Sequence, residues 1–254
     1  MKLVSAAACA ALMLAASTAL AQGVDEFGPY GGQGGQDYES PQHFALELRL
    51  GPYRPRVDGS FNGSAAPYQD IFGSKKRYLV GLELDWQALR IPGVGTLGPG
   101  LGWGYTSASG QALLSDGSGG RAAQDTSLTI MPMYLVGVFR ADVLARKTPV
   151  PLVAYAKAGF GYALWWSNSG GSTSHAADGR VARDASYGYQ FALGGMFLLD
   201  SIDRDAAHEM DNATGVNNSY FFMEWYYSSL DGFGSGKQMQ VGANTWMLGL
   251  AFEF

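Results

Sequence analysis

An alternation of residue types with a period of two recurs in eight segments of this chain and constrains its fold more than any other feature. In residues 78–86, the even positions hold Tyr, Val, Leu, Leu and Trp, whereas the odd positions hold Leu, Gly, Glu and Asp. Successive side chains of a β-strand point to opposite faces, so this pattern predicts a strand with two unlike faces. Clusters of turn residues separate the segments, which indicates an all-β fold.

Seven of the eight segments divide their residue types in the same way, with larger apolar side chains on one face and Gly, Ala or charged side chains on the other. The exception, residues 127–140, is apolar on both faces, so its orientation stays open. The other segments are residues 44–50, 97–105, 152–166, 187–197, 220–227 and 245–254. The pattern does not decide between eight strands and ten.

Composition indicates what the large apolar faces contact. Charged residues make up 15% of the chain and Gly accounts for 36 of its 254 residues, whereas typical proteins have about 25% and about 7%. A soluble sandwich would expose Lys, Glu and Thr rather than Gly on its outer faces. A membrane barrel instead turns apolar and aromatic side chains outward and small or polar ones inward. The sequence therefore predicts an eight-stranded antiparallel transmembrane β-barrel over residues 42–254.

The connections between the segments alternate in length in the way that outer-membrane barrels show, with long extracellular loops and short periplasmic turns. With the N-terminus in the periplasm, the extracellular connections are residues 54–76, 107–126, 167–184 and 228–238, which are long except for the last. The periplasmic ones are residues 87–95, 141–149 and 200–217, and only the last is long. Residues 199–210 read as a short periplasmic helix, capped by Asp200 or Ser201 and ended by Gly215, which explains the exception.

The first 21 residues have the features of a cleaved secretory signal peptide. Lys2 precedes an Ala- and Leu-rich stretch, and residues 19–21, Ala-Leu-Ala, fit a cleavage site for export. The single cysteine, Cys9, lies inside this segment, so the processed chain is expected to have no disulfide. Residues 22–41 are rich in Gly and Gln without periodicity, which is typical of a flexible tail, here on the periplasmic side.

Charged side chains on the small-residue faces are expected to meet inside the barrel as a polar network. Eight strands enclose an interior that side chains can just fill, which favours an ion-paired plug over a narrow conducting path. On either interpretation the charges must pair, because unpaired buried charges are costly. The expected network consists of Glu47, Arg49, Glu83, Asp85, Lys157, Glu224 and Glu253.

Aromatic residues on the apolar faces are expected to form girdles at the membrane boundaries. Tyr78 and Trp86 are eight positions apart on one face, or ~26 Å along a strand, close to the ~25 Å apolar band of such barrels once the strand is tilted. The expected girdle residues are Tyr78, Trp86, Trp103, Trp166, Trp225 and Trp246.

The final stretch TWMLGLAFEF resembles the signal by which bacterial outer-membrane barrels are recognised for assembly. Its signal residues are Trp246, Leu248, Leu250, Phe252 and Phe254. In size the chain is similar to the barrels of the OmpA, OmpX and OmpW families. Residues 151–166, 219–234 and 245–254 look more like an uncharacterised family of outer-membrane barrels, for which no activity is assigned. The resemblance implies a cell outer membrane location in a Gram-negative bacterium, with membrane lipids and the barrel assembly machinery as partners.

Three other motifs have simpler interpretations than a functional site. Residues 93–98 match G-x-G-x-x-G, but a strand rather than a phosphate-binding helix follows them. The helix at 199–210 carries acidic residues and His208, yet it lacks the Gly and bidentate Glu of a calcium loop. His175 lies near Ser172, Ser174 and Asp178 in a Ser- and Gly-rich loop, which does not hold a catalytic triad rigidly.

These observations predict a monomeric barrel with a structural or surface-interaction role and a lumen plugged by polar side chains. A narrow channel or small-molecule transporter is the alternative, and a membrane lipid-modifying enzyme comes third. The net charge of -5 argues against nucleic-acid binding. No cofactor, metal site or catalytic residue is expected, and the ligand of the extracellular loops stays unknown.

Overall fold

The computed structural model describes residues 43–61, 63–74, 77–113, 120–170, 172–173 and 181–254. The expected signal peptide, the expected tail and His175 lie outside these residues. Within the described part of the chain, no helix has the length and apolar character needed to cross a membrane.

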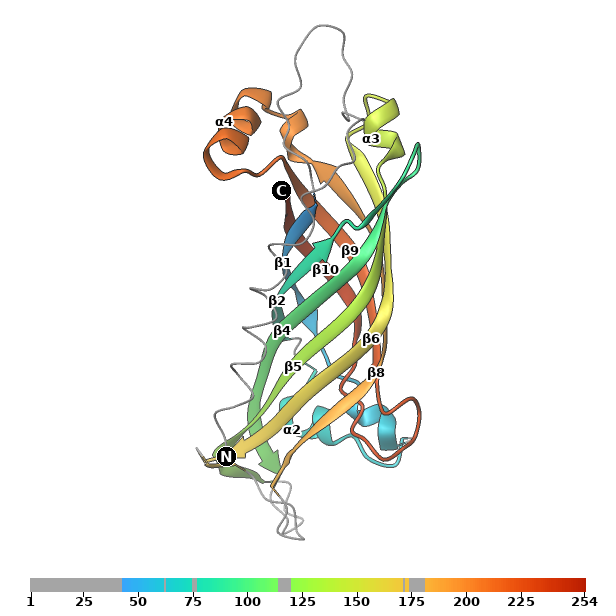
Figure 1. Ribbon diagram of the computed structural model, residues 1–254. Helices are drawn as coiled ribbons and strands as arrows, with labels where there is room; N and C mark the ends of the chain where they lie inside the picture. The colour runs from blue at the N-terminus through green and yellow to red at the C-terminus, as the bar shows by residue number, and fades with distance from the viewer. Residues whose placement is uncertain (1–42, 62, 75–76, 114–119, 171, 174–180) are drawn as a thin grey trace, which may run out of the picture. The chain divides into compact units, whose positions relative to one another are not determined.

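Eight antiparallel strands form a closed barrel, as the alternation predicted (Figure 1). Each strand pairs with its neighbours in chain order, β1 pairs with β10, and a β2–β4 pairing completes the ring. The short strands β3 (Leu89–Ile91) and β7 (Ser172–Thr173) each pair with a single strand, β4 and β6 respectively, so the barrel has eight strands rather than ten. The barrel strands are β1 (Phe44–Tyr53), β2 (Arg77–Trp86), β4 (Gly95–Leu113), β5 (Arg121–Ala141), β6 (Leu152–Ser169), β8 (Arg183–Leu198), β9 (Asn218–Leu230) and β10 (Asn244–Glu253).

The two ends of the barrel differ in their connections. At the end where β1 begins and β10 finishes, here called the terminal end, Phe44 and Phe254 exchange backbone hydrogen bonds of 2.9 and 3.0 Å. This end carries α3 (Val143–Lys147), η3 (Leu199–Ser201) and α4 (Arg204–Thr214), near the top of Figure 1. The opposite end, here called the loop end, carries η2 (Val57–Phe61) and α2 (Pro67–Phe72).

The strands are tilted steeply around the barrel. A path that steps from each residue to its direct partner on the next strand leaves β6 at Leu152 and crosses all the remaining barrel strands in turn. It returns to β6 at Tyr162, ten residues further on. A stagger of about ten residues around eight strands corresponds to a tilt of about 40°, given ~3.3 Å per residue and ~4.8 Å between strands. Ten residues of a strand therefore climb about 25 Å along the barrel, which is the height of the apolar band of a membrane barrel.

The inside and outside faces follow the predicted alternation, and the structure resolves the one ambiguous strand. In β5, Leu135 is 57% exposed and Val136 only 3%, so the even positions point inward. Tyr134 and Arg140 share that parity and are buried. Large apolar side chains cover the outside of the other strands, as in transmembrane barrels.

Element boundaries differ from the sequence-based expectations at both ends of the barrel. At the loop end, β4 and β5 continue as a paired hairpin through residues that were expected to be loop, as far as the pair Leu113 and Arg121. At the terminal end, α4 begins later than expected, because Asp203 caps it by accepting a 3.1 Å hydrogen bond from the Ala206 amide. Its end at the left-handed Gly215 is as predicted.

Candidate functional site

The lumen brings together all seven charged residues that the alternation placed inside the barrel. Glu47 and Arg49 come from β1, Glu83 and Asp85 from β2, and the others from β6, β9 and β10. Glu47 and Glu83 pair directly across β1 and β2, and both are fully or almost fully buried. Like charges at directly opposed positions repel one another, so this arrangement requires cations close by.

Lys157 supplies the first of these cations from β6, on the opposite wall. Its ammonium nitrogen lies 2.6 Å from Glu47 Oε2 and 2.8 Å from Glu83 Oε1, and its side chain is completely buried. It therefore bridges the two opposed carboxylates. Charge-assisted hydrogen bonds of this length are among the stronger polar contacts in proteins.

Arg49 forms the centre of the network. Its guanidinium lies 2.9 Å from Glu47 and from Glu83 and 3.1 Å from Glu224. It also donates a 2.6 Å hydrogen bond to the hydroxyl of Tyr134, which in turn donates to Glu83 at 2.7 Å. Arg49 thus joins three strands, β1, β2 and β9, and connects them to β5.

Arg140 is the third buried cation, and the sequence analysis did not find it. It pairs with Asp85, with Glu47 at 2.9 Å and with Glu253 at 2.8 Å. It was missed because β5 is apolar on both faces, which left its orientation open. The available signal was that Tyr134 and Arg140 share one parity within that strand.

Tyrosine and glutamine side chains complete the edges of the network. Tyr155 donates a 2.9 Å hydrogen bond to Glu224, and Tyr220 donates one of 3.0 Å to Glu253. Gln87 donates a further 2.7 Å bond to Glu253 from the turn after β2. The charges are therefore tied to neutral donors as well as to cations.

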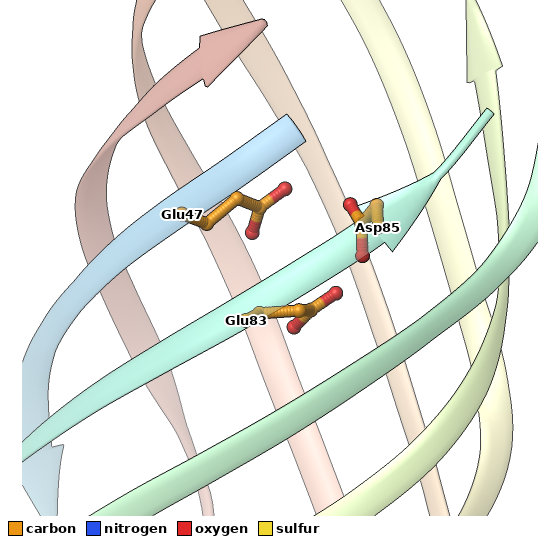
Figure 2. A group of neighbouring side chains, drawn as sticks. All are labelled: Glu47, Glu83 and Asp85. Atoms are coloured by element: carbon orange, nitrogen blue, oxygen red, sulfur yellow. The ribbon is translucent and has the colours of Figure 1, made fainter. Parts of the chain in front are cut away.

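Three of the carboxylates lie close enough together to resemble a metal site (Figure 2). One oxygen each of Glu47, Glu83 and Asp85 falls within 4.8 Å of the others, and Figure 2 shows their carboxylates converging from β1 and β2. Each of the three already accepts a hydrogen bond from Lys157 or Arg140. This group is therefore an ion-pair cluster, because the cationic side chains of Lys157 and Arg140 bind its carboxylates.

The network carries more carboxylates than cations. Five acidic groups face three basic ones, Arg49, Arg140 and Lys157, which leaves a formal charge of -2. Within the described residues, Asp85 Oδ1 and Glu224 Oε1 are buried without a hydrogen-bond partner. Both carboxylates are ion-paired through their other oxygens, Asp85 with Arg140 and Glu224 with Arg49.

Toward the loop end, the interior changes from polar to apolar. Val57, Tyr68 and Phe72 enter from the connection between β1 and β2 and join inward side chains of the strands in one buried cluster, here called the apolar cap. Val241 joins it from the connection before β10, and Tyr53 donates a 2.7 Å hydrogen bond to its carbonyl. Residues of two connections therefore pack inside the lumen at the loop end.

Asp58 holds the helix of the apolar cap in place. Its carboxylate accepts hydrogen bonds from the amides of Tyr68 and Gln69, at 2.7 and 3.2 Å, and so satisfies the first turn of α2. Burial raises the pKa of the Tyr68 hydroxyl, which keeps this side chain neutral. The helix thus presents Tyr68 and Phe72 to the lumen as an uncharged surface.

Glycines line the wall of the lumen on β4 and make room for the network. A Cβ at Gly102 would lie 2.0 Å from the ring of Tyr134. Only glycine therefore lets this ring lie flat against β4 with its hydroxyl between Arg49 and Glu83. The space that a side chain at Gly102 would take is occupied by the Tyr134 ring.

The expected girdle residues all lie on the outer face, at different heights. Tyr78, Trp86, Trp103 and Trp246 are exposed, whereas Trp166 and Trp225 are half-buried. Trp166 lies four residues beyond Tyr162 toward the loop end of β6. In the expected assembly signal, Trp246, Leu248, Leu250 and Phe254 are exposed and Phe252 is half-buried, all on the outer face of the last strand.

The remaining sequence motifs do not form sites. Residues 93–98 make the turn from β3 into β4, so no helix N-terminus is available for a phosphate. His208 and its acidic neighbours lie on the exposed face of α4. Among the described residues, the acidic side chains that gather closely are instead those of the lumen.

Several solved structures resemble this one. No protein-family model matches the sequence, and no curated protein sequence does. Ail, the attachment invasion locus protein of Yersinia pestis, in a complex with the heparin analogue sucrose octasulfate, has 13% identity and a TM-score of 0.42, covering 84% of this chain and 97% of that one. The outer membrane protein OprG of Pseudomonas aeruginosa has 11% identity and a TM-score of 0.44, covering 85% and 97%. Neisserial surface protein A has 12% identity and a TM-score of 0.41, covering 84% and 97%.

Proposed function

We propose that this protein is an outer-membrane β-barrel with a structural or surface-interaction role and a lumen that does not conduct. The observation that carries the proposal is that two layers of buried side chains occupy the interior, the ion-paired network and, nearer the loop end, the apolar cap. Because both layers are built from side chains packed against one another, an ion would have to displace buried partners to pass. The protein is proposed to be non-enzymatic and to need no cofactor.

The outer surface supports a location in a membrane. Large apolar side chains such as Leu50, Leu101 and Leu193 are exposed on β1, β4 and β8. In water these would form an apolar patch far larger than soluble monomers expose, whereas in lipid they are the expected outer face. Residues 1–21 are proposed to direct export and to be cleaved. The outward residues of β10 are proposed to be recognised by the assembly machinery.

The loop end is proposed to face the exterior of the cell and the terminal end the periplasm. The connections at the terminal end are short or helical, as in α3 and α4, while the strands of the loop end extend beyond the apolar band. Recognition would then involve the hairpin of β4 and β5 and the connections beside it. This assigns the interaction surface to the same end as the apolar cap.

A narrow channel is the second candidate, and the excess negative charge of the lumen is the observation that favours it. Asp85 Oδ1 and Glu224 Oε1 lack partners within the described chain and could hold a cation in transit. The two candidates differ in one measurable quantity. Single-channel recording of the refolded barrel in planar bilayers should show no discrete current steps, whereas reproducible cation-selective steps would establish the channel and overturn the plug.

A variant without the network's central cation serves as the positive control for this recording. Arg49→Ala removes the guanidinium that joins β1, β2 and β9. It should admit water and give transient currents while the wild type stays silent. If the wild type conducts as much as the variant, the network does not close the lumen.

A further inference from the structure

A row of aromatic rings crosses the outer face of β6, β8 and β9 near the loop end. The ring centroids of Phe160 and Tyr187 are 6.4 Å apart, those of Tyr187 and Phe233 are 5.7 Å, and those of Phe233 and Tyr189 are 6.5 Å. Tyr227 extends the row, 6.2 Å from Tyr189. These five residues, here called the aromatic row, form a continuous surface that is only partly covered by protein.

Phe233 reaches this surface from a loop by means of an unusual backbone. Among the described residues it is the only one other than glycine with a positive φ, at 56°, and its side chain is 58% exposed. Its neighbour Gly232 donates a 2.8 Å hydrogen bond to the Tyr187 carbonyl, and the amide of Gly234 donates to Asp231 at 2.9 Å. The left-handed conformation is unfavourable for a phenylalanine. It is maintained here in a position that turns an apolar ring outward instead of into the lumen.

The aromatic row lies about one apolar-band height from the start of β6, toward the loop end. Tyr187 pairs directly with Tyr162, which lies ten residues beyond Leu152 on β6, toward the loop end. This separation is about 25 Å along the barrel, the height of the band. With Leu152, the first residue of β6, taken as the periplasmic edge of the band, the rings lie where acyl chains meet headgroups. Tyrosine is favoured at that level because its ring is apolar and its hydroxyl is polar.

Arg56 lies at the end of the row with its charge unmatched. Its guanidinium carbon is 4.9 Å from the centre of the Tyr227 ring, and one of its nitrogens donates to the Ser228 carbonyl at 3.1 Å. Its Nε is buried without a hydrogen-bond partner, and no carboxylate of the described chain lies within ion-pair distance of Arg56. Asp231, the nearby acid of the Phe233 loop, is bound by Ser229 and Gly234.

We propose that the aromatic row and Arg56 together bind a phosphate-bearing glycolipid of the outer leaflet. The acyl chains would lie against the rings, and the phosphate would meet the guanidinium at headgroup height. Arginine forms strong, directional hydrogen bonds with phosphate oxygens. The row is continuous with the lipid-facing surface, which favours a lipid over a protein partner. This inference rests on the proposed location in the outer membrane, but it does not depend on whether the lumen conducts.

The test is lipid binding to the full refolded barrel in uncharged micelles, measured by native mass spectrometry with lipid A and with dephosphorylated lipid A. The wild type should bind lipid A about tenfold more tightly than dephosphorylated lipid A, which is the smallest effect expected of a charge-assisted hydrogen bond. Arg56→Gln should remove this preference, and Arg56→Lys should restore part of it. Phe233→Ala should weaken the binding of both lipids equally.

Arg54→Gln is the matched control, since Arg54 is two residues away and exposed, and already contacts Gln69 and Asp58. It should leave both affinities unchanged. Each variant is first checked for the slower migration of unfolded protein after boiling, and Phe233→Leu replaces Phe233→Ala if the latter does not fold. Equal binding of the two lipids by the wild type, or an equal loss in Arg54→Gln and Arg56→Gln, would overturn the site. Neither result bears on the conductance of the lumen, so this inference and the plug can fail separately.

Discussion

The polar network and the apolar cap occupy the same lumen but are held together by different physical means. In the network, each charge depends on particular partners: Arg49 alone contacts three carboxylates and a tyrosine. In the apolar cap, Val57, Tyr68 and Phe72 contribute area and volume, and the hydroxyl of Tyr53 anchors the cap to a single backbone carbonyl. The network should therefore respond sharply to the loss of a single atom, and the cap only gradually.

The largest expected effect is the removal of the central cation of the network. Arg49→Met keeps most of the side-chain volume but leaves Glu47, Glu83 and Glu224 without their shared partner. Breaking a buried charge network in this way should lower the free energy of unfolding by about 3–5 kcal/mol. Equilibrium unfolding in denaturant, with the barrel in micelles, measures it.

Arg54→Met provides the control for that experiment. Arg54 is exposed and lies 4.0 Å from Asp58, so its loss should change the free energy of unfolding by less than about 1 kcal/mol. Similar losses for the two arginine variants would mean that the buried network is not the stabilising element.

A pair of matched hydroxyl deletions compares the two regions directly. Tyr134→Phe removes a hydroxyl bonded to both Arg49 and Glu83, whereas Tyr53→Phe removes one bonded to a single carbonyl in the cap. The first should cost about 1.5–3 kcal/mol and the second about 0.5–1.5 kcal/mol of unfolding free energy, because bonds to charged groups are stronger. The same denaturant titration decides the order, and the reverse order would contradict the distinction between the regions.

Gly102→Ala tests whether the β4 wall positions the network. The added methyl would lie 2.0 Å from the Tyr134 ring and push its hydroxyl away from Arg49. Overpacking of this kind should cost about 1–3 kcal/mol. Gly137→Ala is the control, because its Cβ would point outward with its nearest contact at 3.9 Å. Comparable denaturant midpoints of unfolding for the two variants would show that the Tyr134 ring can move aside without loss of stability.

The smallest effect is expected at the anchor of the cap helix. Asp58→Ala removes the carboxylate that accepts from the amides of Tyr68 and Gln69. Loss of such a capping interaction should cost about 1 kcal/mol and loosen α2 while the network stays intact. Hydrogen exchange should then rise at the α2 amides and remain slow in β1 and β2. Faster exchange in those strands would show that the cap supports the network.

The difference between the two regions also explains what could be predicted from the sequence. Glu47, Glu83 and Lys157 lie on strands whose two faces are unlike, so alternation alone placed them inside. Arg140 lies on the one strand that is apolar on both faces, and its direction depended on the pairing with its neighbours.

The apolar cap was not predicted at all. Val57, Tyr68 and Phe72 belong to a connection without strand periodicity, and only the closed barrel shows that this connection folds into the mouth. The extension of β5 back to Arg121 was missed for a related reason, since its residues there are polar and lack the alternation. Sequence periodicity therefore identifies side chains that strands direct into the lumen, but it does not identify side chains that a connection inserts there.

The most direct test of a closed lumen is the water accessibility of a residue between the network and the cap. Ala192 is fully buried on β8 and pairs with Lys157 on one side and Tyr226 on the other. In a chain without residues 1–21, which contain the only cysteine, Ala192→Cys should not react with a small charged thiol reagent added to barrels in vesicles. Ala123→Cys, at an exposed position of β5 near the loop end, should react rapidly. Equally rapid labelling of both positions would show that water fills the lumen and would contradict the plug.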